Sequence, residues 1–133
     1  EYQRPQDNWD EKLSGPYFLK IGSPSIRWRV TNPSAEVGFL DPNHPILNFP
    51  NKISSKDFNN WIKERGLYFA SSWDEKYKPL FMMSDDNEQP LLGGLLAADY
   101  GSGRHIHCAL NLFYQMDNLV PGAFRLFVNI LKK

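Results

Sequence analysis

Cysteine, net charge and long apolar runs are all scarce in this sequence, and each shortage excludes a class of protein. Cys108 is the single cysteine, which excludes an internal disulfide, a multi-cysteine zinc site and a Cys-x-x-Cys redox pair. Lysine plus arginine number 15 and aspartate plus glutamate number 15, so the formal net charge is zero. Nucleic-acid binding is disfavoured, because polyanion binders normally carry a basic excess. No apolar run approaches the ~20 residues that a membrane-spanning helix needs, so no membrane span is predicted.

The composition that remains is typical of a folded domain. The 133 residues are 41% hydrophobic and 14% aromatic, which is enough to form a core in a chain of this size. We therefore predict a single domain over residues 1–133. Seven of the ten prolines lie in the first fifty residues, where they disfavour long helices and central strands. Residues 1–50 are accordingly expected to be extended with short strands, and residues 51–133 to be more regular.

One helix and several short strands are predicted before the last third of the chain. The helix begins near Ser54, a good N-cap, with Asp57 at N3 where a carboxylate favours the helix dipole. Gly66 is expected at the C′ position, where it ends the helix. A turn is predicted at DPNHP, residues 41–45. Short strands are predicted at residues 17–21, 35–40 and 67–70, and residues 79–83 form a further short apolar run.

A β-hairpin is predicted from residues 92–99 and 104–112, joined by the sequence Tyr100-Gly-Ser-Gly. Its glycines permit the positive φ that a tight connection needs. Because side chains alternate along a strand, Ile106 and Cys108 are expected on one face and His105 and His107 on the other.

The last predicted element is a helix over residues 121–131. Proline suits its first turn. Apolar residues surround most of its axis, so we expect this helix to be substantially buried.

Four stretches of the chain carry a family resemblance. They are DPNHPILNFPNKI at residues 41–53, DFNNWIKERGLYF at 57–69, YGSGR at 100–104 and VPGAFRLFVNIL at 120–131. Together they resemble the C-terminal end of large bacterial PIG-L (LmbE-like) deacetylase proteins, in which a zinc deacetylase domain is followed by a region similar to class I glutamine amidotransferases. The resemblance covers roughly residues 15–131.

The resemblance implies an α/β fold with a mixed β-sheet flanked by a few helices, as in the C-terminal part of a three-layer, flavodoxin-like domain. It also implies a neighbouring deacetylase domain as partner and a periplasmic or secreted location. The family's zinc motif resembles Ala-His-Pro-Asp-Asp, whereas His44-Pro45 here is followed by Ile46. No deacetylase residue is therefore transferred to this chain, and no nucleophile elbow is present.

The pair His105 and His107 is an arrangement that suggests a metal. Both side chains project from one face of the predicted strand and could reach one ion, with His44, Asp99 or Asn111 as a third ligand. The favoured interpretation is that the two histidines are structural, so no metal or other cofactor is assigned.

Cys108 is predicted to be an inert core thiol. It lies among apolar neighbours, and the adjacent His107 points to the opposite face of the strand. The catalytic interpretation, with a histidine as base, is disfavoured, and no catalytic residue is assigned.

A candidate polar site combines residues around the end of the predicted helix with the two strand histidines. Its members are Glu64, Arg65, Tyr68, His105 and His107. The alternative is a structural network, in which Arg65 bonds carbonyls at the helix C-terminus and Glu64 pairs locally. This alternative is favoured.

Tryptophans in loop-rich contexts are the candidates for stacking on a sugar ring, namely Trp9, Trp28 and Trp73. The alternative is core packing or an interface, since aromatic residues dominate both.

The leading functional hypothesis is a non-catalytic accessory domain of a PIG-L-like (N-acetylglucosaminyl) deacetylase, which packs on a partner domain and contributes to saccharide binding. One alternative is a small hydrolase acting on a glycan or amide with His105, His107 and a carboxylate. The other is a protein-interaction module without a small ligand.

Overall fold

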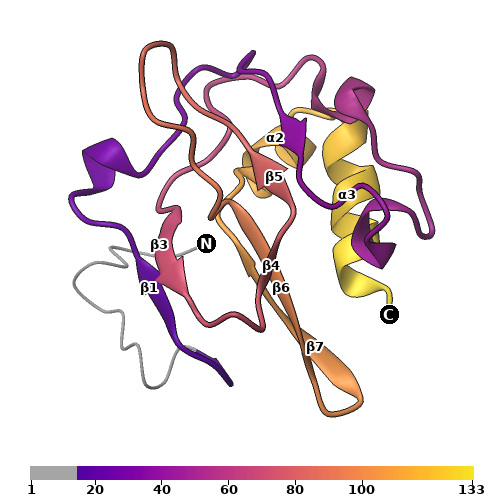
Figure 1. Ribbon diagram of the computed structural model, residues 1–133. Helices are drawn as coiled ribbons and strands as arrows, with labels where there is room; N and C mark the ends of the chain where they lie inside the picture. Colours follow the sequence, from indigo (N-terminus) through magenta and orange to yellow (C-terminus); the bar gives the residue numbers. More distant parts are fainter. Residues whose placement is uncertain (1–14) are drawn as a thin grey trace.

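The computed structural model describes residues 15–133, which form a mixed α/β structure of short strands and two C-terminal α-helices (Figure 1). The strands are β1 (Leu19–Ile21), β2 (Gly38–Phe39), β3 (Ala70–Trp73), β4 (Lys78–Pro79), β5 (Phe81–Met82), β6 (Leu95–Tyr100) and β7 (Gly103–Cys108). The α-helices are α2 (Leu112–Asp117) and α3 (Pro121–Leu131), and 3₁₀ turns form η1 (Ser25–Arg27), η2 (Pro45–Leu47) and η3 (Ser55–Phe58).

The strands form small antiparallel sheets rather than one mixed sheet. The pairings are β1 with β3, β2 with β5, and a three-stranded sheet in the order β4-β6-β7. The expected flavodoxin-like layer of parallel strands is not found among the described residues. A parallel pair needs a long crossover connection, usually a helix, whereas β4, β5, β6 and β7 follow one another through loops and turns.

The β6–β7 hairpin confirms the sequence prediction. Its register runs from Leu95 opposite Cys108 to Tyr100 opposite Gly103, and Gly101 adopts φ +57° in the connecting turn. Figure 1 shows this hairpin projecting away from the rest of the ribbon. The second strand is shorter than predicted, because residues from Leu112 onward form α2 instead.

The long helix predicted from Ser54 is wrong beyond its first turn. The N-cap is confirmed, since Asp57 Oδ2 accepts a hydrogen bond from the Ser54 amide at 2.9 Å and completes a capping box. The regular helix nevertheless ends at Phe58, and Asn60 and Lys63 adopt left-handed φ values of 64° and 71°. Gln115 of α2 explains the difference. Its side-chain Oε1 accepts from the Ile62 N–H and its Nε2 donates to the Ile62 carbonyl oxygen, so these bonds replace those that Ile62 would make inside a helix.

Gly66 has a different role from the predicted helix terminator. It lies between two segments distant in sequence and forms β-bridges with Val30 and with Leu110. A Cβ atom at Gly66 would lie 2.4 Å from the Ala109 carbonyl oxygen and 2.8 Å from the Phe69 ring. Glycine is therefore required for the close approach of the three segments.

The apolar core forms two clusters of buried side chains. The larger one joins residues from Val30 to Leu126, and the smaller lies under β1 and β3 around Tyr77 and Leu96. The predicted strands at residues 17–21 and 35–40 are confirmed in shortened form, and the apolar run at 79–83 is divided between β4 and β5. The strand predicted at 67–70 begins only at Ala70, because Tyr68 adopts φ 63°.

Helix α3 has the predicted bounds, but its expected burial is only partly correct. Ala123, Leu126 and Asn129 are fully buried, and the Asn129 amide donates to the carbonyl oxygens of Ile46 and Asn51. The opposite face remains open, with exposed fractions of 42% at Phe124, 46% at Val128 and 69% at Leu131. No described helix is long and apolar enough to span a membrane.

Candidate functional site

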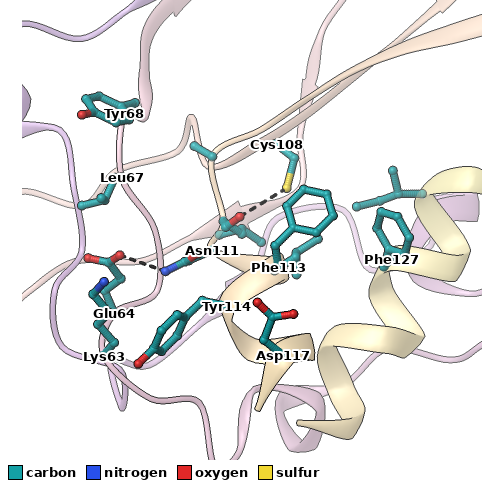
Figure 2. A pocket seen from close by; sticks show the side chains of 14 residues that line it. Lys63, Glu64, Leu67, Tyr68, Cys108, Asn111, Phe113, Tyr114, Asp117 and Phe127 are labelled. Carbon is teal, nitrogen blue, oxygen red and sulfur yellow. Dashed lines mark hydrogen bonds between the residues drawn. The ribbon is translucent and has the colours of Figure 1, made fainter. Parts of the chain in front are cut away.

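A pocket of about 350 Å³ lies where the loop of residues 63–68 meets the end of β7, α2 and α3 (Figure 2). Pockets of this volume are in the range that holds small ligands. Its walls are formed by Lys63, Glu64, Leu67, Tyr68, Cys108, Ala109, Leu110, Asn111, Leu112, Phe113, Tyr114, Asp117, Phe127 and Ile130.

The loop on one side of the pocket is held in an unusual conformation. Lys63 and Tyr68 both adopt left-handed φ values, 71° and 63°, which non-glycine residues rarely adopt because Cβ crowds the backbone. The buried Gln115 side chain holds this loop by donating to the Ile62 and Glu64 carbonyl oxygens. Strained backbone of this kind persists only where surrounding structure enforces it, and it is common at binding sites.

One end of the pocket is polar. Glu64 is only 9% exposed, and its Oε1 accepts a hydrogen bond of 2.9 Å from Asn111 Nδ2, as Figure 2 shows. The Lys63 ammonium lies 4.9 Å from the centre of the Tyr114 ring, a cation–π contact. Asp117 adds a second, exposed carboxylate. This end therefore combines fixed hydrogen-bond acceptors with an aromatic ring.

The other end of the pocket is apolar. The Phe113 and Phe127 rings meet edge to face with centroids 5.8 Å apart, and Ile130 and Leu110 complete the wall. Burial raises the pKa of the Cys108 thiol to about 11. Cys108 is thus protonated at neutral pH, and the thiol is a poor nucleophile.

The predicted polar site is divided by the structure. Glu64 and Tyr68 line the pocket, but Arg65 does not. The buried Arg65 guanidinium instead donates twice to the Ala35 carbonyl oxygen and once to that of Phe58. It also lies over the Phe58 and Trp61 rings. Burial lowers the pKa of Arg65 to about 10, so the residue stays charged and its role is structural.

The two strand histidines lie outside the pocket. His105 shares a 2.9 Å hydrogen bond between its Nδ1 and the Tyr77 hydroxyl, and burial lowers the pKa of His105. His107 is fully buried, and the pKa of His107 is lowered to about 4, first by burial and second by His105, with a hydrogen bond to the Tyr68 backbone opposing the shift.

Two of the three proposed third metal ligands, His44 and Asn111, are engaged in hydrogen bonds elsewhere. His44 Nδ1 accepts from the Ile46 amide, and Asn111 bonds Glu64. Across residues 15–133, no three side chains of His, Cys, Asp or Glu gather into a group that could hold a metal ion. The metal interpretation therefore gains no support from the geometry.

Of the tryptophan candidates, Trp28 and Trp73 are not part of the pocket. Trp28 packs against the larger core cluster and lies directly over Gly22, where a Cβ atom would come within 2.0 Å of its ring. Trp73 packs against the smaller cluster. Trp9 lies outside the described residues.

Three aromatic residues of the pocket wall were not among the predicted site residues, namely Phe113, Tyr114 and Phe127. Phe113 and Tyr114 lie on α2, a helix that was not predicted, since the predicted strand ended at Leu112. The signal that could have found α2 is the spacing of Leu112 and Met116, four residues apart as on one helical face.

Comparisons of the chain with protein-family models, curated proteins and solved structures find no match. The function is therefore inferred from the pocket.

Proposed function

We propose that this chain is a non-catalytic accessory domain that binds a saccharide in the Glu64–Asn111 pocket. The observation that carries the proposal is the hydrogen bond between buried Glu64 and half-buried Asn111 in a pocket with aromatic rings in its wall.

A sugar ring matches this arrangement for two reasons. Its hydroxyl groups need fixed donors and acceptors, which a carboxylate and an amide held together at 2.9 Å supply. Its C–H faces pack on aromatic rings such as Tyr114 and Phe113, which have an apolar face and are already ordered by neighbouring contacts.

The hydrolase alternative receives less support. It depends on His105 and His107, neither of which lines the pocket. The one thiol in the wall, Cys108, has a raised pKa. Turnover of chromogenic acetamido-sugars by the purified chain remains the direct test of that alternative.

The first prediction concerns Phe113, which is 53% exposed at the rim of the pocket. Phe113→Ser is expected to weaken binding of the glycans found on an array by about tenfold, because an aromatic anchor is lost. Binding is measured by calorimetry or by NMR titration.

The matched control is Ile26→Ser, a similar apolar-to-polar change at an exposed position outside the pocket. It is expected to leave binding unchanged. Absence of any glycan binding, or equal weakening by both variants, contradicts the proposed function.

A second surface supports the partner part of the proposal. The open face of α3, formed by Phe124, Val128 and Leu131, presents three apolar side chains in a row at helical spacing. We propose that this face packs against a neighbouring deacetylase domain in a periplasmic or secreted protein. In this proposal the chain is the C-terminal part of an amidotransferase-like region, as the sequence resemblance implies.

The test uses the double variant Phe124→Ser and Val128→Ser in the isolated chain and in a full-length protein that carries the deacetylase domain. The melting temperature of the isolated chain should change little, since both side chains are exposed. In the full-length protein the same change should lower the melting temperature of this domain by several degrees. Equal small shifts in both contexts contradict the partner proposal.

A further inference from the structure

The charge of the pocket points to the kind of sugar that it holds, and this inference rests on the proposed function. Three charged side chains line the pocket, the carboxylates of Glu64 and Asp117 and the ammonium of Lys63. The Lys63 ammonium lies over the Tyr114 ring. The described walls thus carry an excess of negative charge.

Glu64 itself has few partners for a buried carboxylate. Its hydrogen bond from Asn111 uses Oε1, and no described residue donates to Oε2. The ion pair found in the described part of the chain joins Arg125 to Asp57, so Glu64 has no cationic partner there. Oε2 is not sealed off from solvent, and Glu64 lines the pocket. Glu64 as a whole is only 9% exposed, and burying a carboxylate is costly unless a donor or cation compensates for it.

The neighbouring cations cannot supply that compensation. Arg65 follows Glu64 in the sequence, but its guanidinium is committed to the Ala35 and Phe58 carbonyl oxygens. The amide of Gln115 reaches the Glu64 main-chain oxygen and not the carboxylate. Lys63, the cation of the pocket wall, lies over the Tyr114 ring and forms no ion pair with Glu64, so a ligand in the pocket would supply the positive contact that Glu64 lacks.

We infer that the ligand places a protonated amine on Glu64, and therefore that the pocket selects an amino sugar with a free amine over neutral or N-acylated sugars. A protonated amine donates up to three hydrogen bonds. Such charge-assisted bonds to a carboxylate are roughly twice as strong as neutral ones. The apolar wall around Phe113 and Phe127 then packs against the C–H face of the same ring.

The experiment compares three β-1,4-linked tetrasaccharides that differ only in the substituent at carbon 2 of each sugar ring. That substituent is an ammonium group in the glucosamine tetramer, a hydroxyl in the glucose tetramer and an acetamide in the N-acetylglucosamine tetramer. Each is titrated into the chain by calorimetry at low salt and mildly acidic pH. The glucosamine tetramer should bind about tenfold more tightly than the other two, and added salt should reduce this preference.

The variants assign the preference to Glu64. Glu64→Gln should bring the three affinities within about threefold of one another, since the charge–charge contribution is lost. Asp117→Asn changes an exposed side chain, cannot disturb the core, and should reduce the preference partly. The control Glu75→Gln makes the same charge change at an exposed position outside the pocket and should leave the preference intact.

The outcomes separate this inference from the proposed function. If the glucose or N-acetylglucosamine tetramer binds at least as well as the glucosamine tetramer, and Phe113→Ser weakens that binding, the amine inference is wrong and the saccharide function stands. An amine preference that survives both Glu64→Gln and Asp117→Asn also overturns the inference. If none of the tetramers binds, the inference and the saccharide function both fail for this class of glycan.

Discussion

Arg65→Lys is expected to lower the free energy of unfolding by about 3 kcal/mol. The Arg65 side chain is 5% exposed and donates three hydrogen bonds to two main-chain carbonyl oxygens that come from separate segments of the chain. A lysine keeps the cost of burying a charge but loses the planar fork that reaches both carbonyls and lies over two aromatic rings. Urea unfolding followed by tryptophan fluorescence measures the change.

Arg125→Lys provides the matched comparison. Arg125 is half-exposed, and its Nε pairs with Asp57 Oδ1 at 2.7 Å. Water can replace most of the hydrogen bonds that are lost when a lysine takes its place. We expect a cost of about 1 kcal/mol or less. Equal effects at the two positions would show that the buried bonds of Arg65 contribute no more to stability than a surface ion pair.

Stability is expected to fall by about 3 kcal/mol as the pH is lowered from 6.5 to about 4, because His107 must take up a proton. The unfolded chain binds this proton with the ordinary histidine pKa of 6.5, whereas burial lowers the pKa of folded His107 to about 4. Protons therefore favour the unfolded chain throughout this window. The contribution of neutral His107 is complete above pH 6.5 and is lost as the pH approaches 4. Urea midpoints measured across this range test the slope.

His107→Gln removes the titrating group from the same buried position and should flatten most of the slope between these two pH values. In His105→Gln most of the slope should persist, because His107 is the more deeply buried of the two and carries the larger shift. A wild-type slope unchanged in His107→Gln would refute the assignment and leave the carboxylates as the cause of acid unfolding.

Elements whose signals are local in sequence were predictable. The β6–β7 hairpin has glycines in its turn and alternating faces, and both features agree with the structure. The N-cap at Ser54 and the proline that begins α3 were likewise predicted correctly. In each case neighbouring residues alone determine the conformation.

Elements that depend on distant partners were not predictable in the same way. Residues 59–65 have a helical pattern, but the Gln115 side chain and the Val30 carbonyl oxygen accept the backbone hydrogen bonds of Ile62 and Arg65. The same long-range contacts turn Glu64 toward Asn111 and Arg65 away from it. The sequence placed these neighbours in one candidate site, whereas the fold assigns one to the pocket and the other to the core.

The contacts of Gly66 bear on the order in which the chain acquires its structure. This residue bridges to Val30 on one side and to Leu110 on the other. Each bridge closes a long loop of the chain, and the entropy cost of that closure comes before the contacts that stabilise it. During synthesis Val30 and Gly66 leave the ribosome before Leu110 does. Until Leu110 has been synthesised, the nascent chain cannot complete the junction at Gly66. We expect the chain to be most exposed to aggregation and to proteases before that point.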